Sequence, residues 1–170
     1  MTRPYPDDFY GVVDVPFHRF LDVIFERSGP FEPATIRLPA AAGLARLPAE
    51  VFAVAEIGAA IEATDAIWDH VADTELRPML LTTGVSIRHY VEPTGELRAA
   101  SRFIDDTAQT FQRLIAKRKA RCTVAVDVRD ETDQLVADAR AELYLRLMSP
   151  ERWAAMLGSE RPVDAESAVR

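Results

Sequence analysis

The chain has 170 residues, of which 48% are hydrophobic and 28% charged, and its formal net charge is −7. This composition predicts one folded domain and excludes collagen-like, low-complexity and fully disordered chains. The negative charge argues against nucleic acid and anionic membranes as partners, because both attract basic surfaces. A single cysteine, Cys122, excludes an internal disulfide framework and is typical of a reducing compartment.

The first 47 residues combine loop-like and periodic segments. Residues 1–15 are rich in Pro and Asp and lack periodicity, so we expect them on the surface. Apolar residues from Phe17 to Phe25 recur at helical spacing between Pro16 and Gly29, which predicts an N-terminal helix. Residues 34–38 alternate and predict a short strand. No signal-peptide core is found and the apolar window 51–61 is too short to cross a bilayer, so we expect a cytoplasmic protein.

A second helix is predicted from Pro48 to about His70, because proline suits a first helical turn. Residues 51–61 are apolar nearly all round, which is typical of a helix that other structure encloses. Its second half, with Glu62 and Asp65, is more polar and is expected to reach solvent.

The C-terminal half changes its period from 3.6 to 2. Alternating residues predict strands at 84–91, 97–104, 122–129 and 135–147, with a turn at 93–95. Between the second and third strands, Asp106 or Thr107 can cap a short helix that turns Phe111, Leu114 and Ile115 inward. A last helix is expected from residue 149 to 157, stopped by Gly158, with a frayed tail at 159–170. The sequence thus predicts an α+β fold, a curved antiparallel sheet around the 48–70 helix.

Three stretches carry a resemblance to a known fold. They are residues 54–58 (VAEIG), residues 83–93 (TGVSIRHYVEP) with the following GELRA at 95–99, and residues 135–139 (LVADA). The segment from about 17 to 147 resembles the hot-dog fold, in particular its branch of phenylacetate-pathway-type acyl-CoA thioesterases and their relatives. The resemblance implies a single hot-dog domain over residues 1–158. It also implies hydrolysis of an acyl-CoA thioester in a homodimer or a dimer of dimers, with coenzyme A present only as part of the substrate.

The chain departs from that branch at the start of the central helix. Many members have His-Gly-Gly there, which shapes the oxyanion site, whereas this chain has RLPA at residues 46–49.

Glu56 is the candidate catalytic residue on physical grounds alone. A carboxylate within an apolar helix must reach a cleft, find hydrogen-bond donors or become protonated. In a thioesterase of this type it would act as general base on water or attack the thioester carbonyl. The alternative is that Glu56 points to solvent or forms a structural ion pair with an arginine such as Arg88 or Arg102.

The resemblance extends the candidate site to five further positions on the helix and the strand. Thr83 is a second candidate catalytic residue, and Phe52, Thr82 and Ser86 are candidate substrate-binding residues. By likeness, the strand that carries the hydroxyl groups runs beside the active site of a partner subunit. Backbone N–H groups of residues 49–52 are candidates for binding the developing oxyanion.

Lys117, Arg118 and Lys119, together with Arg121, form the densest basic cluster of an acidic chain. They are candidate ligands for the phosphates of coenzyme A. The alternative is that these cations complement the dipole of a helix end and keep the surface soluble.

Other chemistries find no support in the pattern. His18, His70 and His89 lack metal-ligand spacing, so we expect no metal site, and the parity of His89 predicts a core or interface residue. Cys122 has the parity of a buried strand residue. No phosphate loop, Gly-x-Ser-x-Gly elbow or paired Cys motif occurs.

Three functions stay open. The first is thioester hydrolysis at a dimer interface, and the second is a non-catalytic module that binds an acyl or other apolar ligand, favoured by the missing His-Gly-Gly. The third is a hydratase or dehydratase, which usually pairs a His with an acid, but here no His lies near Glu56 in sequence.

Overall fold

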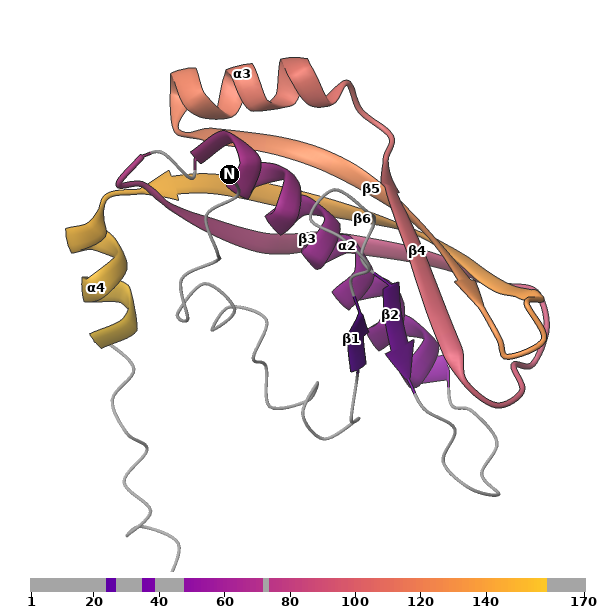
Figure 1. Ribbon diagram of the computed structural model, residues 1–170. Coiled ribbons are helices and arrows are strands. Elements are labelled where there is room, and N and C mark those ends of the chain that lie inside the picture. The colour runs from indigo at the N-terminus through magenta and orange to yellow at the C-terminus, as the bar shows by residue number, and fades with distance from the viewer. Residues whose placement is uncertain (1–23, 27–34, 39–47, 72–73, 159–170) are drawn as a thin grey trace, which may run out of the picture.

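The computed structural model describes residues 24–26, 35–38, 48–71 and 74–158 (Figure 1). The N-terminal residues 1–23, which include most of the expected first helix, and the tail 159–170 lie outside the described residues. Within the described residues, two short strands precede a long helix, and four longer strands follow with two further helices. No helix of the described part of the chain is long and apolar enough to span a membrane.

The strands form one antiparallel sheet in the order β1-β2-β4-β5-β6-β3. The sheet consists of β1 (Ile24–Glu26), β2 (Thr35–Leu38), β3 (Arg77–His89), β4 (Leu97–Phe103), β5 (Lys119–Arg129) and β6 (Leu135–Met148). The predicted strand at 34–38 is therefore confirmed. The prediction of a helix through Phe25 is wrong at residues 24–26, which pair with residues 35–37. Short apolar runs suit either period, and here pairing with β2 decides.

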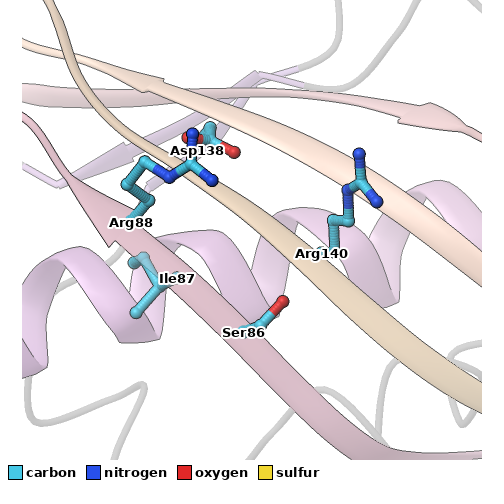
Figure 2. A pocket seen from close by; sticks show the side chains of 5 residues that line it. All are labelled: Ser86, Ile87, Arg88, Asp138 and Arg140. Carbon is cyan, nitrogen blue, oxygen red and sulfur yellow. The ribbon is translucent and has the colours of Figure 1, made fainter.

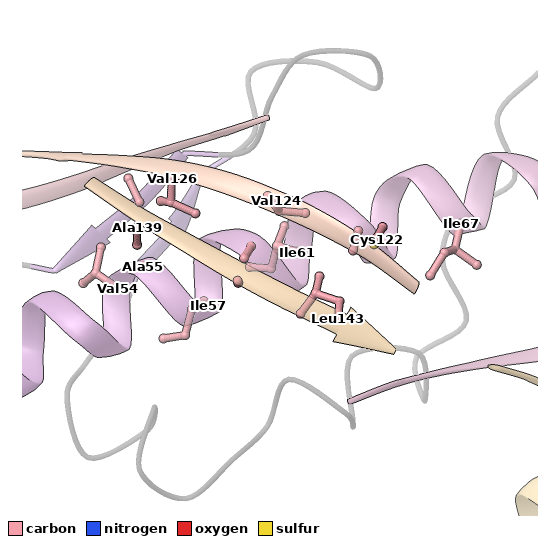
Figure 3. Packing of buried hydrophobic residues seen from close by; sticks show 14 of the residues in the cluster. Val54, Ala55, Ile57, Ile61, Ile67, Cys122, Val124, Val126, Ala139 and Leu143 are labelled. Carbon is pink, nitrogen blue, oxygen red and sulfur yellow. The ribbon is translucent and has the colours of Figure 1, made fainter. Parts of the chain in front are cut away.

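The central helix α2 (Pro48–Val71) lies along one face of this sheet, as the sequence predicted (Figure 1). Its apolar residues pack with those of β5 and β6, and Figure 3 shows Ile61 near Val124 and Leu143. The same face of the sheet carries Ala137, Ala139 and Ala141, all at most 2% exposed. Small residues on both sides let the helix axis approach the sheet closely.

Gly58 marks the closest approach of α2 to the sheet. A Cβ atom at this position would lie 2.9 Å from Ser101 Oγ and 3.2 Å from Ala99 Cβ, both on β4. A side chain at this position would force Ser101 or the helix itself to shift, so glycine permits the close packing.

Strand register assigns each residue to a face of the sheet. Directly paired residues share a face, so Val85 and Ile87, paired with Ala141 and Ala139, face α2. Arg88 and Ser86 therefore lie on the opposite, outer face. The register shifts between Thr82 and Gly84, so Thr83 is the extra residue of a β-bulge. Strand β3 also begins earlier than expected, at Arg77, and ends at His89 rather than residue 91.

Two helices flank the ends of the long strands. Helix α3 (Thr107–Lys117) is capped by Asp106, whose side chain accepts a hydrogen bond of 3.1 Å from Gln109 N. Phe111 and Leu114 are buried as predicted, whereas Ile115 is 41% exposed, contrary to the prediction. Helix α4 (Pro150–Gly158) follows β6 directly.

Asp130 fixes the turn between β5 and β6. It is 2% exposed, and its Oδ1 accepts hydrogen bonds from Thr132 N at 2.9 Å and Gln134 N at 3.2 Å. Its Oδ2 accepts from the backbone N and the hydroxyl of Thr94, at 3.3 and 3.0 Å. One carboxylate therefore ties the β5–β6 turn to the β3–β4 turn.

Candidate functional site

Glu56 lies in the third turn of α2, and its side chain is only partly buried. Helical geometry turns about 100° per residue, so Glu56 points about 160° away from Gly58 and hence away from the sheet. Phe52, four residues earlier, shares this face and is 37% exposed. The sheet of its own chain therefore leaves Glu56 uncovered.

The structure does not support the alternative that Glu56 forms an ion pair. Arg88 and Arg102 both lie on the outer face of the sheet, and Arg102 bonds Asp127 at 3.2 Å. Within the described residues Glu56 makes no hydrogen bond or ion pair. A partly buried carboxylate without a partner is available for chemistry.

The three hydroxyl residues of β3 point in different directions. Thr82 pairs with Leu143 and so faces the side of α2. Thr83, at the bulge, donates its hydroxyl to Glu142 O at 3.0 Å. Ser86 is on the outer face, so within one chain it does not meet Glu56.

Ser86 instead lines a cavity of about 360 Å³ on the outer face, between β3 and β6 (Figure 2). Figure 2 shows it with Arg88, Asp138 and Arg140. Tyr90 donates its hydroxyl to Asp138, and this hydrogen bond raises the pKa of Tyr90. Opposite charges alternate here, which is typical of a solvated sheet face.

A second cavity, of about 290 Å³, lies where β3 ends beside the first turn of α2. Pro48 and Val51 line it from the helix, and His89 lines it from the end of β3. The side chain of His89 is exposed, so the structure does not place it in the core. His89, which is 33 residues from Glu56 in the sequence, thus lies near the first turn of α2. The sequence separation gave no indication of this proximity.

The predicted basic residues line a third and larger cavity, of about 670 Å³. Lys117, Arg118 and Lys119 come from the end of α3 and the start of β5. The cavity also contains residues that sequence analysis did not select, namely Leu76, Tyr144, Arg146, Leu147, Met148, Ser149 and Arg152. The alternating pattern of β6 and the sequence at the start of α4 did not indicate that these residues lie near the basic cluster.

The basic cavity and Glu56 lie at opposite ends of the central helix. Leu76, a lining residue, follows the C-terminal end of α2, whereas Glu56 precedes Val71 by 15 residues. At about 1.5 Å per residue, this separation is about 22 Å along the helix axis.

The remaining candidates are inert or structural. Burial raises the pKa of the Cys122 thiol to about 12, with a further contribution from the Asp105 carboxylate, so Cys122 is not a nucleophile at neutral pH. Among the described residues there is no group of three or more His, Cys, Asp or Glu side chains that could hold a metal ion.

Comparison with known proteins identifies the fold. No family model matches the chain. No curated protein matches it either. Solved structures do match: a probable thioesterase of Pseudomonas aeruginosa, itself of unknown function, has a TM-score of 0.64 at 18% identity and covers 87% of this chain and 99% of its own.

Two further solved structures are similar to this chain in fold. A protein of unknown function from Chlorobaculum tepidum has a TM-score of 0.65 at 12% identity, covering 82% of this chain and 90% of its own. A thioesterase of Staphylococcus aureus has a TM-score of 0.53 at 12% identity, covering 78% and 99%. At these identities the likeness shows the fold, and the predicted hot-dog architecture, a central helix on an antiparallel sheet, is confirmed.

Proposed function

We propose that this chain is an acyl-CoA thioesterase whose active site forms between two copies of the chain. The observation that carries the proposal is Glu56, a carboxylate on the central helix that is turned away from its own sheet and has no side-chain partner among the described residues. The fold supports it, because structures with the same fold include named thioesterases. The specific branch of phenylacetate-pathway enzymes is a narrower form of the same proposal.

The open edge of β3 supports a second copy as the missing cover of Glu56. Among the described strands, β3 pairs with β6 on one side only, and it is 13 residues long. A long open edge is a template for another strand. Large apolar side chains are exposed along it and beside it, at Leu81, Tyr90, Val91 and Phe52. Two β3 strands paired about a two-fold axis would bury this edge in a homodimer. Two such dimers can associate further into a dimer of dimers.

In this site Glu56 acts on a water molecule as general base. The carboxylate accepts a proton as the water oxygen attacks the thioester carbonyl carbon. The tetrahedral intermediate then loses its C–S bond, and the proton passes from Glu56 to the leaving thiolate. The products are a carboxylic acid and free coenzyme A. Backbone N–H groups at the start of α2 are positioned to stabilise the oxyanion.

A hydroxyl at Thr83 can act in two ways, by orienting the attacking water or by binding the thioester oxygen, and its hydrogen bond favours the first. Its hydroxyl proton is committed to Glu142 O, so its oxygen can only accept a further hydrogen bond. This oxygen can accept a hydrogen bond from the attacking water in the active site of the partner subunit, but it cannot donate a hydrogen bond to the thioester oxygen. Thr82, on the face of the sheet that carries α2, and Phe52, on α2 itself, are proposed to contact the acyl group.

A thiol-release assay tests the proposal. Purified protein is incubated with coenzyme A esters of graded acyl length while free thiol is followed. Glu56→Gln should lower kcat/KM at least about a hundredfold with the fold retained. Glu75→Gln, which removes an exposed carboxylate beyond the end of α2, should leave it unchanged.

Two outcomes would contradict the proposal. Equal turnover by Glu56→Gln and wild type would exclude this carboxylate from the reaction. Saturable binding of acyl ligands without thiol release would instead identify a non-catalytic binding module.

The dimer has its own test, the molar mass in solution. Leu81→Lys places a charge beside the open edge and should shift the mass from dimer to monomer. A wild-type chain that is monomeric at micromolar concentration would contradict the proposed interface.

A further inference from the structure

The outer face of the sheet, opposite to α2, carries its charges in rows that cross the strands. Strand register places Asp127 directly opposite Asp138, and it places Ala125 between Arg102 and Arg140. The two aspartates form an acidic row, and the two arginines form an arginine row. The rows are two residues apart along the strands, a distance of about 7 Å.

Further rows continue this order on both sides. Arg98 is directly opposite Arg129 on the far side of the acidic row, and Glu142 lies beyond the arginine row. From one end to the other, the central part of the face is therefore basic, acidic, basic and acidic. Like charges that are directly opposite each other destabilise a sheet, so this arrangement costs stability in the isolated chain.

Arg140 lies at the centre of this face and has no partner in the described part of the chain. Its side chain is exposed and forms no hydrogen bond or ion pair there, whereas Arg102 donates to Asp127 at 3.2 Å. It lines two cavities, of about 360 and 300 Å³, that share it with Asp138 (Figure 2). The second cavity includes Ala125, whose short side chain leaves a hollow between the two arginines. A guanidinium beside such a hollow suits a carboxylate from another molecule.

A second copy of the same face supplies carboxylates in the required pattern. The two-fold axis that does so lies in the plane of contact, at right angles to the strands and midway between the two rows. It places the acidic row of each copy over the arginine row of the other, and Glu142 at the level of Arg98 and Arg129. A two-fold axis parallel to the strands would instead stack rows of like charge. The order of the charges therefore selects one mode of packing.

The dimensions of the face agree with such a contact. Packed sheets lie about 10 Å apart, a gap that opposing arginine and aspartate side chains can span. Strand β5 has 11 residues, and four strands about 4.8 Å apart give a face of about 700 Å² per copy. This area is close to the roughly 800 Å² per partner of a standard protein interface. Nucleic acid or an anionic membrane would fit less well, because the acidic row repels phosphate groups.

We propose that two copies of the chain pack through the outer faces of their sheets. In this contact Asp138 of each copy binds the partner's Arg140, and Asp127 enters the hollow over the partner's Ala125. The surface is distinct from the open edge of β3. The contact therefore doubles whatever assembly that edge forms, giving four chains where the edge forms a dimer.

Charge reversal tests the contact, with the molar mass measured by analytical ultracentrifugation at low ionic strength. Arg140→Glu places a carboxylate against the partner's Asp138, and Asp138→Arg places two guanidinium groups together. Each variant should halve the mass of the assembly and raise its dissociation constant at least about thirtyfold. The double variant, Asp138→Arg with Arg140→Glu, exchanges the two charges and should restore the wild-type mass. Arg113→Glu, the same change on α3, is the control and should keep the wild-type mass.

Three outcomes would overturn the proposal. They are a wild type with the same mass as Arg140→Glu, a double variant that does not recover, and a control that dissociates as the reversals do. Because Arg140 is exposed, its reversal should leave the circular dichroism spectrum unchanged.

The same measurements separate this contact from the dimer of the proposed function. A wild type of two chains that Arg140→Glu converts to monomers would refute the edge dimer alone. A wild type of two chains that Leu81→Lys dissociates and Arg140→Glu does not would refute the outer-face contact alone.

Discussion

Replacing Asp130 tests how far one carboxylate holds together the turns at one end of the sheet. Burial by itself raises the pKa of Asp130, but hydrogen bonds from Thr132 and Thr94 outweigh it and lower the pKa from 3.8 to about 2. A shift of this size corresponds to about 2 kcal/mol of folding free energy. Because the pKa is lower in the folded state, this stabilisation is present above pH 4 and is lost as the pH falls toward 2.

Asp130→Ala removes the acceptor of every hydrogen bond in this cluster. The backbone N–H groups of Thr94, Thr132 and Gln134 lose their partner, so we expect a loss of about 2–4 kcal/mol at pH 7. For a chain of this size the melting temperature should fall by about 5–15 °C. Asp130→Asn keeps one acceptor oxygen and should lose about half as much.

Thermal unfolding followed by circular dichroism at pH 7 and between pH 2 and 4 measures both effects. Glu131→Ala, an exposed neighbour in the same turn, is the control and should change stability by less than about 0.5 kcal/mol. Wild type should lose more stability than Asp130→Ala on acidification. An Asp130→Ala protein that melts within about 2 °C of wild type, or a parallel loss at low pH, would refute this reasoning.

Two other predictions follow from the packing. Gly58→Ala should lower stability by about 1–3 kcal/mol in thermal melts although alanine favours helices, because its Cβ would collide with Ser101 Oγ; a stabilised variant would contradict the close approach. Cys122 should resist a thiol reagent at pH 8 in the native protein and react after unfolding, and rapid native labelling would disprove its burial.

The parts of the fold that the sequence predicted are those with a single, sustained period. Residues 51–61 are apolar nearly all round and form the more deeply buried half of α2, and β6 alternates over its whole length. Strand β1 was missed because Ile24 and Phe25 fit a helical spacing equally well, and only pairing with β2 distinguishes the two. The first residues of β3 were missed because the bulge at Thr83 interrupts the alternation.

The candidate site was predictable only residue by residue. Glu56 stood out because a carboxylate within an apolar run is costly wherever the helix is enclosed. The basic cavity was not predictable as a unit, because Lys119 meets Arg146 through strand register, and Arg152 joins them through the turn into α4. Such convergence depends on tertiary geometry, which local periodicity does not encode.

The close contact between the central helix and β4 at Gly58 separates the part of the chain that sustains the fold from the part that can accommodate ligands. Between α2 and β4 the gap there is too small for a methyl group, so no ligand can be accommodated at that point. Ligands of different length must be accommodated elsewhere, along the rim where Phe52 and Leu81 are exposed. Selectivity could therefore diversify at this rim over evolution while the interior that sustains the fold is left untouched.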